Sequence, residues 1–84
     1  MNREIALGKI KEIFIDVFDD SSLIITEHLS TEDVDHWDSL NHINLLSAIQ
    51  QEFQVTFELS ELHSLKNIGA IIDSVLIKLA DNKK

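Results

Sequence analysis

Apolar residues recur every three or four positions near the end of this 84-residue chain, and this spacing restricts the fold more than any other feature. The residues concerned are Ile68, Ile71, Ile72, Val75, Leu76 and Leu79. Such a period places them on one face of an α-helix, which must be buried against other helices. Asn67 lies directly before them and is a suitable N-cap residue. The sequence therefore predicts a helix that begins after Asn67.

Two earlier segments show the same period. The first runs from about Arg3 to Phe18, with the apolar residues Leu7, Ile10, Phe14 and Val17. The second begins at Asp38 or Ser39 and ends near Gln54, with an apolar stripe of Ile43, Leu46, Ile49 and Phe53 and with Leu40, Leu45 and Ala48 beside it. Asp38 is a good N-cap, because its carboxylate can accept from free amides of the first turn. These patterns predict three main helices.

The remaining segments complete the expected fold. A long connection, Asp19 to Trp37, contains Leu23, Ile24 and Ile25, some of which must tuck against the bundle. A short helix is expected from Ser60 to Ser64 with Ser60 as its cap, and residues 81–84 are expected to form a frayed tail. Absence of proline and scarcity of glycine also favour helix. We predict one domain, residues 1–84, that is all-α: a small four-helix bundle (three main helices plus one short helix) with a long first loop.

Charge and composition exclude several classes of function. The net charge is −8, and no Lys or Arg occurs from Glu12 to Leu65, so nucleic acid is not an expected partner. Proteins with basic patches are expected partners, because an acidic surface attracts them. No apolar run approaches the length of a membrane span, and no signal peptide is recognisable, so we expect a cytoplasmic monomer that does not bind membranes. Without cysteine, the chain has no thiol of its own.

Catalytic and metal sites are not expected either. The histidines are His28, His36, His42 and His63, and none pairs with another at the spacing of four that a helical zinc site uses. No glycine-rich phosphate loop and no calcium loop is present. His36 and Asp35 lie near Ser39 in sequence, but nothing supports a catalytic triad. We predict a protein that is not an enzyme and has no catalytic or metal-binding residues.

The stretch "VDHWDSLNHINLL", residues 34–46, is the most specific feature of the sequence. It places Asp38-Ser39-Leu40 at the start of a helix, after a long acidic loop. "WDSLNHINLLSAIQQEFQVTF" and "ELSELHSLKNIGAIIDSVLIKL" together resemble the acyl carrier proteins over essentially the whole chain. The resemblance implies that 4′-phosphopantetheine from coenzyme A is attached covalently to Ser39, with Asp38 and Leu40 as parts of the recognised motif. It also implies that the missing thiol is supplied by this group.

The position of Ser39 suits a phosphate, because a helix N-terminus carries unpaired amides and a partial positive charge. His42 lies one turn further along the same side. A protonated His42 would approach the phosphate, whereas a solvated side chain is the simpler interpretation. Two alternatives also exist for the apolar residues Ile43, Leu46, Phe57, Leu62 and Ile68. They either pack in the core or line a cavity for the acyl cargo.

The resemblance implies partners and leaves alternatives. A phosphopantetheinyl transferase would modify Ser39, and acyl-loading and acyl-transfer enzymes with basic docking patches would act on the thioester, in fatty-acid, polyketide or other specialised acyl biosynthesis. Trp37 before D-S-L, and the neutral residues Asn41, His42, Asn44, Gln50 and Gln51 on the second helix, suggest a free-standing specialist carrier. The alternatives are an aminoacyl or peptidyl carrier and, from a different class, an unmodified acidic helical adaptor.

Overall fold

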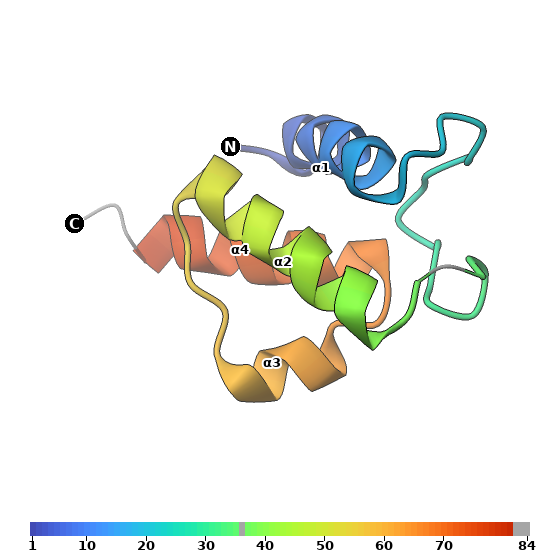
Figure 1. Cartoon of the computed structure of the whole chain (residues 1–84). Coiled ribbons are helices and arrows are strands. Elements are labelled where there is room, and N and C mark those ends of the chain that lie inside the picture. Colours follow the sequence, from blue (N-terminus) through green and yellow to red (C-terminus); the bar gives the residue numbers. More distant parts are fainter. Residues whose placement is uncertain (36, 82–84) are drawn as a thin grey trace.

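The fold consists of four α-helices within the described residues, 1–35 and 37–81, of a computed structural model. The helices are α1 (Arg3–Phe18), α2 (Ser39–Phe53), α3 (Leu59–Ser64) and α4 (Ile68–Asp81). In Figure 1, α1 lies on one side of α2 and α4, and the short α3 lies on the other side. The predicted all-α bundle with a long first loop is confirmed. His36 and residues 82–84, which include most of the expected tail, lie outside the described residues.

Side-chain caps fix where the helices begin. The Asp38 carboxylate accepts from the Asn41 amide at 2.9 Å, and the Asn67 side-chain oxygen accepts from the Ala70 amide at 2.7 Å, so both predicted N-caps are confirmed. The expected cap of α3 is wrong, because the helix begins at Leu59 with Glu58 as N-cap instead of Ser60. The carboxylate of Glu61 accepts from the Glu58 amide at 3.0 Å, and this bond favours the earlier start.

The core lies where α1, α2 and α4 meet. Its fully buried side chains are Ala6, Ile10, Phe14, Leu45, Leu46, Ile49, Ile68, Ile71, Ile72 and Val75. The predicted stripe of α2 is partly wrong, because Ile43 is 49% exposed and Leu40 is 68% exposed. The buried stripe begins at His42 and continues through Leu45, Leu46, Ile49 and Phe53. The first position of this stripe is the polar residue His42. A pattern of apolar residues alone therefore begins one residue later, at Ile43, and assigns an exposed residue to the buried face.

The long first loop is held by backbone hydrogen bonds to the start of α4. Amides of Ile68 and Gly69, which have no partner within the helix, donate to the carbonyls of Leu29 and Glu27 at 2.9 Å each. A Cβ atom on Gly69 would lie 3.1 Å from the Glu27 oxygen, so any other residue would require the loop to move by a few tenths of an ångström. The Thr31 amide donates to the Lys66 carbonyl at 3.0 Å. The loop is therefore fixed against the α3–α4 connection.

Side chains add to this anchoring. Ile25, one of the three loop residues expected to tuck against the bundle, is buried in the core, whereas Ile24 is 83% exposed. Val34 of the loop is buried as well. Arg3 at the start of α1 pairs with Glu27 of the loop and with Asp73 of α4.

None of the helices in the described part of the chain is both long and apolar enough to cross a membrane.

Candidate functional site

Ser39 is the first residue of α2, and its side chain is exposed. Its neighbour Asp38 has an extended backbone and caps the helix, so the chain turns into α2 at this point. The first hydrogen bond within the helix runs from the His42 amide to the Asp38 carbonyl at 2.8 Å. Of the residues between them, Asn41 donates its amide to the Asp38 carboxylate, and the amides of Ser39 and Leu40 have no partner within the helix. The helix end carries a partial positive charge that favours an attached phosphate at Ser39, and the charge of the neighbouring Asp38 opposes it.

Trp37 fixes the end of the loop that leads to Ser39. Its side chain is buried and its ring packs edge-on against Phe14, with ring centroids 5.1 Å apart. Phe18 stacks on Phe14 and also meets the indole edge-on. These three rings join α1 to the residue two positions before Ser39, which restricts where the serine can lie. Trp37 therefore closes the end of the loop over the core.

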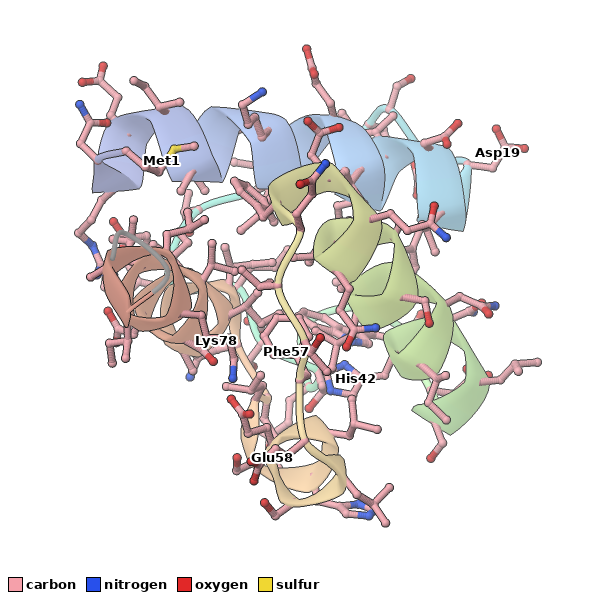
Figure 2. All side chains as sticks on the ribbon, turned by 90° about the vertical axis from the view of Figure 1, so that its left-hand side faces the viewer. Met1, Asp19, His42, Phe57, Glu58 and Lys78 are labelled. Atoms are coloured by element: carbon pink, nitrogen blue, oxygen red, sulfur yellow. The ribbon has the colours of Figure 1, made fainter. Side chains whose placement is uncertain are left out.

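His42 is buried, with 9% of its surface exposed, so the interpretation of a solvated side chain is wrong. The indole Nε1–H of Trp37 donates to His42 Nδ1 at 2.8 Å, and His42 Nε2 lies 3.0 Å from the Leu62 carbonyl oxygen. Because Nδ1 accepts, Nε2 carries the hydrogen and donates to Leu62. Figure 2 shows His42 between α2 and α3. Its ring therefore joins Trp37, α2 and α3 in one chain of hydrogen bonds.

The environment of His42 favours the neutral imidazole. Burial lowers its pKa below the ordinary value of 6.5, the hydrogen bond to Leu62 opposes this shift, and the nearby His63 adds to it. A proton on Nδ1 would also face the donor of Trp37 and remove that hydrogen bond. These contacts leave both ring nitrogens with protein partners, which the spacing of the sequence did not predict.

Glu61 holds α3 against α4. One carboxylate oxygen accepts from Lys78 at 2.8 Å and from the Glu58 amide, and the other accepts from the Ser74 hydroxyl at 2.7 Å. The hydrogen bonds from Glu58, Lys78 and Ser74, in that order of importance, lower the pKa of Glu61 to about 2. This cluster fixes α3, and with it the Leu62 carbonyl that accepts from His42.

A cavity of about 430 Å³ opens beside Ser39. It lies between the first loop, the start of α2 and α3 with its exit, and it is lined by Thr31, Glu32, Trp37, Asp38, Ser39, His42, Leu62, His63 and Lys66. Of the five apolar residues considered for a cargo cavity, only Leu62 lines this one. Leu46, Phe57 and Ile68 are buried in the core, so core packing is confirmed for these three, and Ile43 is exposed, which agrees with neither alternative.

The residues around Ser39 suit a covalently attached phosphodiester. The serine offers an exposed hydroxyl, the helix end offers amides, and Lys66 brings one positive charge to a cavity that Glu32 and Asp38 also line. Sequence reasoning missed His63 and Lys66, because both belong to α3 and its exit, which only the fold brings near Ser39. Among the described residues, no cluster of His, Asp and Glu is arranged to bind a metal ion.

Comparisons with known proteins agree with this geometry. Residues 8–75 match the family model described as "Phosphopantetheine attachment site". The structure is similar to the solution NMR structure of a holo acyl carrier protein from Geobacter metallireducens, with a TM-score of 0.82 and 42% sequence identity, over 90% of this chain and 87% of that chain. The comparison with curated proteins found no match.

The family match covers most of the chain and includes Ser39. Its defining feature is the covalent attachment of 4′-phosphopantetheine, which confirms the expected cofactor. Proteins of this kind carry groups and do not catalyse reactions, which confirms that the chain is not an enzyme. From the matched segment, the shared fold and the identity with the holo protein, we conclude that this chain belongs to the acyl carrier protein family.

Proposed function

We propose that this chain carries acyl intermediates as thioesters on a 4′-phosphopantetheine arm attached to Ser39, in fatty-acid, polyketide or other specialised acyl biosynthesis. The observation that carries the proposal is the exposed Ser39 hydroxyl at the N-terminus of α2, beside a cavity. The bound arm supplies a thiol, which this cysteine-free chain lacks. Asp38 caps the helix, and Leu40, 68% exposed, offers an apolar contact to the modifying enzyme.

The modification is a phosphoryl transfer by a partner enzyme. The Ser39 oxygen attacks the pyrophosphate phosphorus of coenzyme A that bears pantetheine. A bond from that phosphorus to Ser39 forms as its bond to 3′,5′-ADP breaks, and the hydroxyl proton passes to a base of the transferase. Within this chain, α2 supplies the exposed hydroxyl and the positive helix end that favours the product phosphate.

Intact mass tests this assignment. The purified chain is incubated with coenzyme A, magnesium and a broad-specificity phosphopantetheinyl transferase. We expect a gain of one phosphopantetheinyl group, no gain in Ser39→Ala, and a full gain in Ser47→Ala, a control at another exposed serine of α2. Wild-type protein that stays unmodified with several transferases, or a Ser39→Ala protein that is still modified, would refute the proposal and favour an unmodified adaptor.

We also propose that the partners read the first loop and the start of α2. Glu32, Asp33 and Asp35 are exposed there and complement basic docking patches. Further along α2, the exposed Asn44 and Gln51 are neutral, whereas Gln50 is half-buried and its side chain accepts from the Phe57 amide at 2.7 Å. Gln50 therefore serves the fold, which corrects its expected place on the exposed face.

Because Asn44 and Gln51 on the exposed face of α2 are neutral, we expect general acyl-loading enzymes to load this chain slowly. Each missing exposed ion pair is worth about 0–1 kcal/mol, so two of them lower affinity by up to about 30-fold. The modified protein is loaded with malonate by a general malonyl transferase, beside the double variant Asn44→Glu, Gln51→Glu. We expect the variant to load several-fold faster. Equal rates would show that these positions do not select partners.

A further inference from the structure

The hydrogen-bonded chain Trp37–His42–Leu62 lies between the cavity beside Ser39 and the apolar core. All three residues line the cavity, whereas the core residues Leu46 and Ile68 do not. Trp37 and His42 are themselves nearly inaccessible to solvent. The bridge also joins the last residues of the loop to α2 and α3, so it spans the space between those two helices.

We propose that this bridge closes the core to the cargo and that His42 restricts the chain to short acyl groups. The inference rests on the proposed attachment at Ser39. A short group on the arm remains in the cavity or in solvent. A long aliphatic chain gains stability only where it is removed from water, and the buried apolar residues Leu45 and Leu46 follow His42 on the same face of α2.

Entry of a long chain would break the bridge. Movement of His42 would leave the Trp37 indole N–H and the Leu62 carbonyl without their partners, and a buried polar group without a partner is strongly destabilising. Both groups have partners at 2.8 and 3.0 Å, and among the described residues no buried side-chain polar atom lacks one. In the closed arrangement both polar groups therefore have a hydrogen-bond partner, and in the open arrangement neither has one.

The lining of the cavity agrees with a short cargo. Lys66 and Glu32 bring charges to the cavity, and Thr31 brings a hydroxyl. Among the described residues that line it, only Leu62 and Trp37 have large apolar side chains. A long hydrocarbon would gain little in such a cavity and would separate charged groups from water. A short acyl group fits this mixed surface without either cost.

The test compares two cargo lengths on the intact protein. Wild-type chain is loaded at Ser39 with the acetyl or the octanoyl form of the arm, from acetyl- or octanoyl-coenzyme A, and loading is checked by mass. Failure to load would refute the function proposed above, before the bridge is tested. The two loaded forms are then compared by melting temperature and by the NMR signal of the indole N–H, which is unambiguous because Trp37 is the only tryptophan.

We expect melting temperatures within about 1 °C of each other and an unchanged indole signal in the two wild-type forms. In His42→Ala, which opens the bridge, the octanoyl form should melt about 4 °C or more above the acetyl form, because the chain can then be buried. His63→Ala removes another histidine of the same cavity and should behave like wild type. Each comparison is made within one variant, so a general loss of stability does not imitate the result.

Two outcomes would overturn the proposal. A wild-type octanoyl form that melts several degrees higher and shifts the indole signal would show that the core already admits long chains. A His42→Ala protein without any length dependence would show that His42 is not the barrier. If His42→Ala does not fold, the wild-type comparison still decides whether the core is closed.

Discussion

Replacement of Glu61 by glutamine should loosen α3 from α4 without changing the shape of the side chain. The Glu61 carboxylate accepts from the Glu58 amide, the Ser74 hydroxyl and the Lys78 ammonium, at 2.7–3.0 Å. Glutamine keeps one acceptor oxygen for Glu58, and its amide can donate to Ser74. It loses the ionic bond to Lys78, in which both side chains are about one quarter exposed.

The magnitude follows from that lost bond. A hydrogen bond between charged groups contributes about 1.5–3 kcal/mol when buried, and an exposed ion pair contributes about 0–1 kcal/mol. For a pair at intermediate exposure we expect Glu61→Gln to lower the free energy of unfolding by about 1–2 kcal/mol. In a domain of this size, this corresponds to a melting temperature lower by about 4–16 °C.

Urea unfolding followed by circular dichroism measures the effect, with Glu52→Gln as the matched control. Glu52 pairs with Lys9 at 3.5 Å between more exposed side chains, so its replacement should change stability by less than about 0.5 kcal/mol. The difference between wild type and Glu61→Gln should also fall as the pH drops from 4.5 towards 2, because protonation of Glu61 removes the same bond. Equal stability of the two proteins at neutral pH would refute this account of how α3 is held.

Three further predictions concern the loop, the buried histidine and the acidic surface. Gly69→Ala should destabilise the protein by about 1–2 kcal/mol in urea unfolding, since its Cβ would crowd the Glu27 carbonyl, and an unchanged midpoint would contradict this. Because the pKa of folded His42 lies below 6.5, the unfolded chain binds more protons in that range, so stability should fall as the pH drops below about 6.5; His42→Gln should lose this dependence. Magnesium or sodium chloride should raise the melting temperature by screening the net charge of −8, and a flat titration would show that the acids are already compensated.

Helices with apolar residues at every third or fourth position could be predicted from the sequence, because their burial follows from the period alone. The bounds of α1 and the caps Asp38 and Asn67 agree with the structure. The start of α3 could not be predicted as well, since Glu58 becomes its cap only when Glu61 accepts from its amide. Short helices contain too few residues for a period to show.

The candidate site was predictable only in part. The D-S-L motif predicts Ser39 as the attachment residue, but the cavity beside it also depends on residues from α3 and its exit. The burial of His42 was missed because polar residues are usually assigned to the exposed face. The signal that indicates burial is the helical spacing of His42 with Leu45, Leu46 and Ile49. It is recognised only when a polar residue is allowed at a position of the buried stripe. The hydrogen bonds that His42 shares with Trp37 and Leu62 explain why a polar side chain is tolerated at this buried position.

The backbone bonds that join the first loop to α4 also have a consequence for motion. They connect Glu27 and Leu29 to Gly69 and Ile68, and the same loop continues into Thr31 and Glu32, which form one wall of the cavity. A fluctuation that separates the loop from α4 must therefore also widen the cavity. The amides of Thr31, Ile68 and Gly69 should show one common free energy of opening in hydrogen exchange, because a single opening event exposes all three. That free energy sets the fraction of time for which the surroundings of Ser39 are open.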